Sequence, residues 1–146
     1  GTDPEGHFAA VHELSCEAFA HNPFYQPLDR ESFVAMYMPM VPHLVPDLVL
    51  MALDPDDGTL LGYLFGVPNF AEGPRPTAAI LKTYASRRHG VGHHLAHAFH
   101  ERAAAMGFSH AIHALIHEAN DSSDRSRRHG GVPFRRYALF GRRLAP

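Results

Sequence analysis

Hydrophobic side chains recur with a helical period in the first third of the chain. They fall every three or four positions from Phe8 to Ala20, which predicts a helix that the Asn-Pro pair at 22–23 ends. A second helix is predicted to start at Asp29, a residue type favoured as an N-cap, and to stop before Pro39. The N-terminal part of the chain is therefore expected to form two helices.

In the middle of the chain the spacing of hydrophobic positions changes from a helical to a strand pattern. Two apolar runs, Leu48–Leu53 and Leu60–Val67, flank the turn-forming segment Asp54–Gly58 and predict a β-hairpin. The remaining expected elements are a strand over Thr77–Ala85, a helix over His93–Met106 that Gly107 ends, a strand over Ala111–Ile116, a helix over Asn120–His129 closed by two glycines, and a strand over Phe134–Phe140. With 146 residues, of which 45% are hydrophobic and 19% charged, the chain is predicted to form one domain over residues 1–146.

The connection between the third expected strand and the long helix carries the most chemical information. It reads Arg87-Arg88-His89-Gly90-Val91-Gly92, a glycine loop placed after a strand and before a helix. Such a loop directs backbone N–H groups and the positive end of a helix dipole at one point, which suits a phosphate. It contains neither the Gly-x-Gly-x-x-Gly of dinucleotide folds nor the Gly-Lys-Ser/Thr of P-loops, so those two classes are not indicated.

The Arg-x-x-Gly-x-Gly pattern and the order of elements resemble the GNAT acetyltransferase superfamily. Further stretches similar to one actinobacterial-type branch of it are Lys82–Ala85, Gly107-Phe108, Ala114–Asn120 and Arg135–Phe140. The resemblance implies an α/β (α+β) acyl-CoA N-acyltransferase fold with a mixed central sheet and helices on both faces. The family's first strand is missing, because the chain opens with a helix. We therefore expect a fragment or the C-terminal GNAT domain of a tandem protein.

The same resemblance implies that acetyl-CoA, or another acyl-CoA, is the co-substrate and that the reaction is transfer of an acetyl group to a primary amine. The strand ending in Thr83, Tyr84 and Ala85 would line the pantetheine arm, and the strands that start near Thr77 and Ala111 would diverge. The cofactor-binding residues that it implies are Thr83, Tyr84, Ala85, Arg87, Arg88, His89, Gly90, Val91, Gly92 and Asn120.

Direct transfer to an amine requires a base for the amine proton and a donor for the departing thiolate. We expect His117 to act as the base or as a partner of a relaying water, with Glu118 second. In this family a Tyr often protonates the departing thiolate. Arg127 occupies the corresponding position here, and the adjacent Ser126 is the remaining candidate for that acid. Without that Tyr, a catalytically degenerate domain that binds CoA or a partner protein stays an alternative.

Charge is distributed unevenly along the chain. Residues 1–80 contain eleven acidic and two basic residues, a net charge of −9, whereas residues 81–146 contain four acidic and eleven basic residues, a net charge of +7. The basic half contains the glycine loop, as a ligand with several phosphates requires. The acidic half, with Tyr25, Tyr37 and Phe70, favours an amine-bearing small-molecule or peptide acceptor. Protein N-termini, aminoglycosides, polyamines and amino acids all remain open.

Other partners and classes are less favoured by the sequence. No nucleic-acid-binding signature and no run of about 20 apolar residues is present, so neither nucleic acid nor a membrane is expected and the protein is predicted to be cytoplasmic. A homodimer or a second GNAT domain in the full chain stays open. Cys16 is the only cysteine, so an internal disulfide is excluded.

Histidines provide the competing interpretation. His93, His97 and His100 share one helix face, and three imidazoles at such spacing can hold zinc. His110, His113 and His117 add three more nearby in the sequence, but none of the His-Glu pairs continues into His-Glu-x-x-His. A polar helix face explains the pattern better, so no metal is expected, and a zinc-binding module stays the minor alternative.

Overall fold

The structure is a computed structural model of the chain, and it describes residues 3–22, 25–114, 116, 121–138 and 140–142. Two compact units make up the chain, Gly1–Leu115 and Ile116–Pro146, and each is described by itself. In the described residues no helix is both long enough and apolar enough to cross a bilayer.

Two N-terminal helices form where the sequence predicts them. Helix α1 spans Pro4–Phe19 and begins four residues before the first apolar position, because the Asp3 side chain accepts a hydrogen bond from the Gly6 N–H at 3.0 Å and caps it. Helix α2 spans Arg30–Tyr37. Its cap is the predicted Asp29, whose carboxylate accepts hydrogen bonds from the Ser32 N–H at 2.8 Å and the Ser32 hydroxyl at 2.7 Å. Two 3₁₀ turns, Met38–His43 and Pro46–Leu48, then lead to the sheet.

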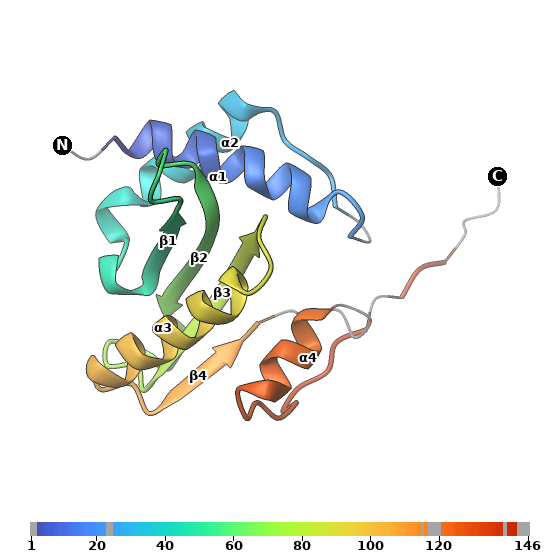
Figure 1. Cartoon of the computed structure of the whole chain (residues 1–146). Coiled ribbons are helices and arrows are strands. Elements are labelled where there is room, and N and C mark those ends of the chain that lie inside the picture. The colour runs from blue at the N-terminus through green and yellow to red at the C-terminus, as the bar shows by residue number, and fades with distance from the viewer. Residues whose placement is uncertain (1–2, 23–24, 115, 117–120, 139, 143–146) are drawn as a thin grey trace. The chain divides into compact units, whose positions relative to one another are not determined.

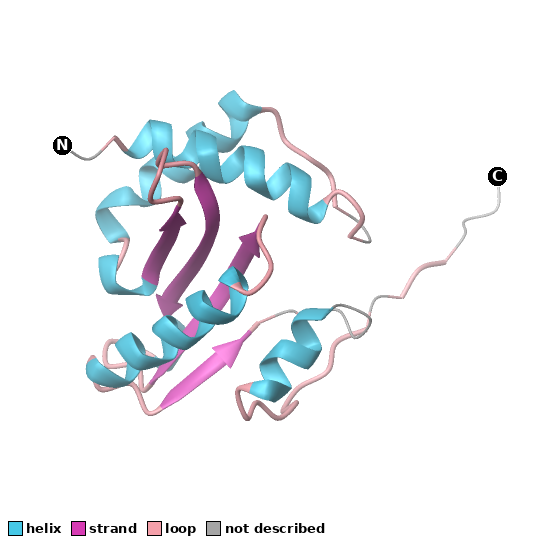
Figure 2. Cartoon of the chain, in the orientation of Figure 1, coloured by secondary structure: helices cyan, strands magenta, loops and turns pink. Residues whose placement is uncertain are grey.

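The first unit is built around a four-stranded mixed sheet (Figures 1 and 2). Its strands are β1 (Val49–Leu53), β2 (Leu60–Pro68), β3 (Ala78–Ser86) and β4 (His110–His113), and they lie in the order β1-β2-β3-β4. Strand β2 is antiparallel to both β1 and β3, and β4 runs parallel to β3. A parallel pair requires a crossover, which helix α3 (Val91–Ala105) provides after the glycine loop. The predicted mixed sheet is confirmed.

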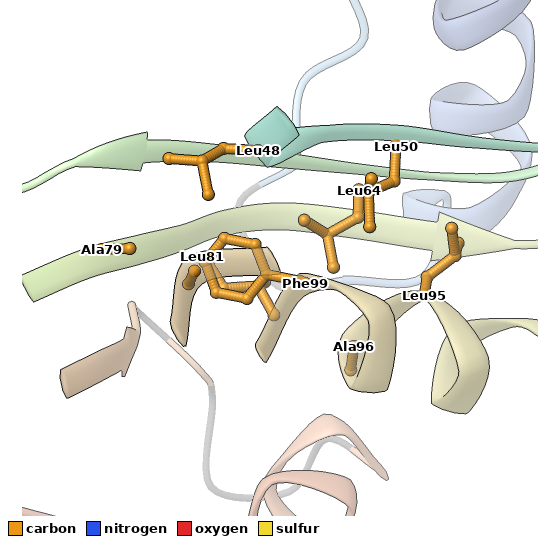
Figure 3. Close-up of a cluster of buried hydrophobic side chains, with 9 residues drawn as sticks. Leu48, Leu50, Leu64, Ala79, Leu81, Leu95, Ala96 and Phe99 are labelled. Atoms are coloured by element: carbon orange, nitrogen blue, oxygen red, sulfur yellow. The ribbon is translucent and has the colours of Figure 1, made fainter. Parts of the chain in front are cut away.

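Helices cover both faces of this sheet, as predicted. Helix α3 packs on one face, where Phe99 is fully buried among Leu48, Leu64 and Leu81 (Figure 3). On the other face, Leu14 of α1 is fully buried in a smaller cluster with Leu60, Tyr63 and Ala85. Burial of such aliphatic and aromatic side chains is the main source of stability for a unit of this size.

Two glycines of β2 let α3 approach the sheet closely. A Cβ at Gly66 would lie 2.4 Å from Cε2 of Phe99, and a Cβ at Gly62 would lie 2.8 Å from Cγ1 of Val91. Neither distance is compatible with a real side chain. Glycine at these positions therefore allows the first turn of α3, and with it the glycine loop, to rest directly on the sheet.

Strand β3 contains a bulge that reverses the direction of its side chains. The register with β2 runs Phe65↔Thr83 and then Gly66↔Leu81, so Lys82 is an extra residue without an opposite partner. Leu81 packs in the cluster under α3, whereas Ala85, four residues later, packs in the cluster on the α1 face. Strict alternation would have kept both residues on one face.

The second unit contains helix α4 (Asp121–Arg128), which confirms the helix predicted at 120–129. Gly130, at φ 78°, ends it in the left-handed conformation. The strand predicted over Phe134–Phe140 is wrong for the described residues 134–138 and 140, which form no strand. Apolar positions do not alternate in this segment, and Phe134, Tyr137 and Phe140 are exposed. Without alternation the segment has no apolar face to bury against a core, which is what favours a strand.

Candidate functional site

The glycine loop turns the chain directly from β3 into α3. Strand β3 ends at Ser86, Gly90 has φ 85° and ψ −29°, and α3 begins at Val91. A positive φ of this size favours glycine, and no atom lies within 4 Å of the position that a Cβ at Gly90 would occupy. The loop therefore has an open concave side next to the N-terminus of a fifteen-residue helix.

Several backbone donors of the loop have no acceptor in the described part of the chain. The N–H groups of Val91, His93 and His94 bond to carbonyl oxygens of Arg88 and Gly90. No described group accepts from the N–H groups of Arg88, His89, Gly90 or Gly92. Unpaired backbone N–H groups at a helix N-terminus can bind an anion. Arg88 and His89 are exposed, Gly90 is half-buried and Gly92 is buried. Within the described residues, the amides expected to hold a pyrophosphate are thus not consumed by internal hydrogen bonds.

The Arg87 side chain, predicted to bind the cofactor, pairs with two carboxylates of α1. Its guanidinium donates to Glu17 of α1 in a bidentate pair, from Nε at 2.7 Å and from Nη2 at 2.9 Å, and Nη2 lies 3.3 Å from Glu13. This hydrogen bond lowers the pKa of Glu17 and raises the pKa of Arg87. The Arg87 N–H also bonds to the Leu61 carbonyl at 2.9 Å. Arg87 therefore fastens the loop to α1 and to β2 with the same groups that a ligand would use.

Two basic side chains of the loop remain exposed. Arg88 is 67% exposed and approaches Asp54 only to 3.9 Å, and His89 is exposed beside it. An exposed guanidinium can turn toward a phosphate at little cost, since a pair at this distance in water is weak. The positive charge available at the loop thus comes from Arg88 rather than from Arg87.

The pairing between β3 and β4 covers only part of β3. It runs from Ala78↔His110 to Leu81↔His113, and the Ala114 N–H donates to the Leu81 carbonyl at 3.1 Å. Strand β3 continues to Ser86. The segment Thr83–Ala85, expected to line a pantetheine arm, lies beyond the last paired residue, where the two strands were predicted to part.

A cavity of ≈ 280 Å³ lies between the N-terminal helices and the sheet, next to this point of β3. Lys82 and Thr83 line it at the bulge, and Tyr63 lines it from β2. The helices contribute aromatic walls: the Phe33 and Tyr37 rings pack 4.6 Å apart, and Phe8 stacks on Tyr37 at 5.8 Å. The predicted acceptor residues Tyr25 and Tyr37 line the cavity, but Phe70 does not line it and is exposed.

Tyr63 and Ser15 contribute two buried hydroxyl groups to the cavity. The Ser15 hydroxyl donates to the Val11 carbonyl at 2.6 Å, so its oxygen must accept the proton that Tyr63 donates across 2.8 Å. Burial raises the pKa of Tyr63 to about 12, which keeps it neutral. Sequence reasoning missed this pair, because Ser15 and Tyr63 lie far apart in the chain.

The structure does not test the remaining predicted site residues. His117, Glu118 and Asn120 lie outside the described residues. Ser126 lies on α4 of the second unit, and its carbonyl accepts from the Gly131 N–H at 2.9 Å. Their catalytic and cofactor-binding roles stay predictions.

The histidines of α3 form pairs. His97 lies 3.5 Å from Glu101, and the Nε2 atoms of His100 and His113 are 2.8 Å apart. Within the ranges that the structure describes, no group of three or more His, Cys, Asp or Glu side chains is arranged to hold a metal ion.

Comparison with known proteins identifies the fold. No protein-family model matches the sequence, and no curated protein matches it. Solved structures do match over nearly the whole chain. A probable acetyltransferase is 12% identical with a TM-score of 0.67, and the match covers 97% of this chain and 94% of that protein.

Two matches have bound ligands. AAC(6')-Iy, an aminoglycoside N-acetyltransferase in complex with a CoA-linked bisubstrate analogue, is 16% identical with a TM-score of 0.64, and the match covers 95% and 93% of the two chains. An aminoglycoside acetyltransferase from an uncultured soil metagenomic sample, in complex with sisomicin, is 18% identical with a TM-score of 0.62, and the match covers 97% and 90%. The chain therefore has the GNAT acetyltransferase fold that its glycine loop and order of elements predicted.

Proposed function

We propose that the protein is an acyl-CoA-dependent N-acetyltransferase that transfers an acetyl group to a primary amine of a small molecule. One observation carries this proposal: the backbone N–H groups of four loop residues donate to no described group. These residues are Arg88, His89, Gly90 and Gly92. They lie at the N-terminus of α3, and similar folds bind CoA or a CoA analogue. Acetyl-CoA would supply the activated acyl group.

The residues of the chain would divide the work between two places. The loop amides and Arg88 would hold the pyrophosphate, Gly90 would let it approach the backbone, and the β3 segment Thr83–Ala85 would line the pantetheine arm. The cavity beside Lys82 would receive the acceptor amine. Holding the two reactants together in this way supplies much of the rate enhancement of a direct transfer.

Proton transfer is assigned by prediction only. We propose His117, with Glu118 second, for the removal of the amine proton and Ser126 for the return of a proton to the departing thiolate. A base is needed because a primary amine is protonated at neutral pH and attacks only in its neutral form.

A thermal shift measurement tests the cofactor site. At a concentration 100 times the dissociation constant, acetyl-CoA should stabilise the protein by about 2.7 kcal/mol. The variant Gly90→Asp places a carboxylate beside the loop amides and should abolish this shift. Gly58→Asp is the matched control, because Gly58 also has a positive φ (76°) and open space around it but lies in the β1–β2 turn.

Both variants should lose a similar amount of intrinsic stability, and only Gly90→Asp should lose the response to acetyl-CoA. No shift of the unmodified protein at millimolar acetyl-CoA would refute the proposal. So would an equal shift in the two variants. Release of the CoA thiol in the presence of an amine then establishes turnover.

A further inference from the structure

The cavity beside β3 differs in charge from the half of the chain that builds it. Residues 1–80 have a net charge of −9, but none of the described residues that line the cavity is an Asp or a Glu. The acidic side chains nearby are used elsewhere: Glu17 pairs with Arg87, Asp29 caps α2, and Asp54 accepts within the β1–β2 turn. Among the described lining residues, the acidic excess predicted to attract a cationic acceptor is therefore not represented.

The one charged side chain among the described lining residues is a cation, Lys82. It enters the lining because it is the extra residue of the β3 bulge, and its side chain is exposed. A second ammonium group on an acceptor would lie near this like charge without a carboxylate to compensate. Like charges brought close together repel, although water around the exposed Lys82 side chain weakens the effect.

The rest of the cavity suits an apolar body. Its walls include the rings of Phe8, Phe33 and Tyr37 and the side chains of Val11 and Leu28. Its volume of ≈ 280 Å³ lies near the lower end of ligand pockets, which run from about 300 to 1,000 Å³. A molecule with one ring or a short branched chain fits this size.

We infer that the acceptor is a small monoamine with an aromatic or aliphatic body, and that the charge of the cavity disfavours polyamines and aminoglycosides. This inference rests on the proposed transferase function and names the substrate class of the same site. It separates this chain from the similar fold that was solved with sisomicin. Single amines remain acceptable because an aromatic wall attracts one ammonium group weakly and does not require a carboxylate.

The same surroundings favour the reactive form of the amine. Desolvation and a nearby cation both disfavour the charged ammonium, so an amine bound beside Lys82 should lose its proton more readily than in water. The Tyr63 hydroxyl donates to Ser15, which leaves its oxygen lone pairs able to accept an N–H from the neutral amine. The cavity thus binds an apolar body and assists deprotonation.

The test measures the reaction of different acceptor amines with acetyl-CoA in the presence of this chain. Phenethylamine and isoamylamine represent apolar monoamines, spermidine represents polyamines, and sisomicin represents aminoglycosides. Release of the CoA thiol should give a kcat/KM at least tenfold higher for one of the monoamines than for either polycation. Equal or higher values for spermidine or sisomicin would overturn the inference, and so would the lack of turnover with both monoamines.

Two variants at one position test the role of charge. Lys82→Glu introduces the missing carboxylate and should raise the ratio of kcat/KM for spermidine to that for phenethylamine by about tenfold or more. Lys82→Gln is the matched control, because it removes the cation without adding an acceptor for a second ammonium, and it should change this ratio less. An unchanged ratio in Lys82→Glu would contradict the assignment of this cavity as the acceptor site.

Acetyl-CoA binding is measured separately in each variant, so the two proposals can fail independently. If acetyl-CoA causes no thermal shift, the transferase function itself is wrong. If acetyl-CoA binds and polycations are the better acceptors, only the substrate class is wrong.

Discussion

Replacement of Gly66 by Ala tests the packing that brings α3, and thus the glycine loop, onto the sheet. The added Cβ would lie 2.4 Å from Cε2 and 3.1 Å from Cδ2 of Phe99, and 2.9 Å from the Leu48 carbonyl oxygen. Phe99 is fully buried in the core cluster, so its ring can move away only by displacing its neighbours. The carbonyl belongs to the chain entering β1 and cannot move without disturbing the sheet.

The expected cost is at the upper end of the range for overpacking, about 3 kcal/mol. For a chain of this length that corresponds to a fall of roughly 10 °C in Tm. Urea unfolding followed by circular dichroism measures the free energy directly. Gly141→Ala is the control, because no atom lies within 4 Å of the position that a Cβ at Gly141 would occupy. The stability of this variant should equal that of the parent or be slightly higher.

A double-mutant cycle identifies the clash. Phe99→Leu alone should cost about 1–2 kcal/mol through lost burial. Combined with Gly66→Ala it should cost about 1–2 kcal/mol less than the sum of the two, because the shorter side chain removes the contact with the ring. Relief should be incomplete, since the Leu48 carbonyl stays in place. Simple additivity, or a Gly66→Ala protein as stable as the parent, would refute the packing argument.

Three further predictions concern ionisable groups. Because the pKa of Tyr63 is raised to about 12, its contribution to stability is complete below pH 10 and is lost as the pH rises toward 12; Tyr63→Phe should flatten the alkaline part of the stability profile. The pKa of Glu17 is lowered by Arg87, so its contribution is complete above its ordinary pKa of 4.5 and is lost as the pH falls through the lowered value; Glu17→Gln should reduce the acid dependence of unfolding. Glu72→Gln replaces the carboxylate that accepts the hydrogen bond from the Thr77 N–H by a neutral amide. This hydrogen bond should become weaker, and hydrogen exchange of the Thr77 amide should be faster than in the parent.

The sequence predicted most of the first unit because its signals are local. Asp29 predicted the start of α2, and Pro39 its end, since a cap and a missing N–H act within a few residues. Gly90 in a loop between a strand and a helix was recognised for the same reason: its φ of 85° is a property of one residue. The start of α1 was predicted too late, because apolar spacing was followed instead of the cap at Asp3.

Features that depend on distant residues could not be predicted. Arg87 was assigned to the cofactor because it lies in the loop, but its partner Glu17 is seventy residues away on α1. The sequence shows the acidic excess of residues 1–80 but not where these side chains lie in space. None of the described residues that line the cavity is acidic. The strand expected at Phe134–Phe140 is absent from the described residues of that segment, whose apolar positions lack the alternation that a half-buried strand requires.

The bulge at Lys82 explains how one strand can serve both the core and the site. Before it, Ala79 and Leu81 pack under α3; after it, Ala85 packs on the α1 face and Thr83 lines the cavity. Without the extra residue, Thr83 would point under α3, and the cavity would lose its wall beside the unpaired part of β3. A single inserted residue therefore places the candidate acceptor cavity next to the candidate path of the thioester. It also puts a cation where a carboxylate would have favoured polyamines.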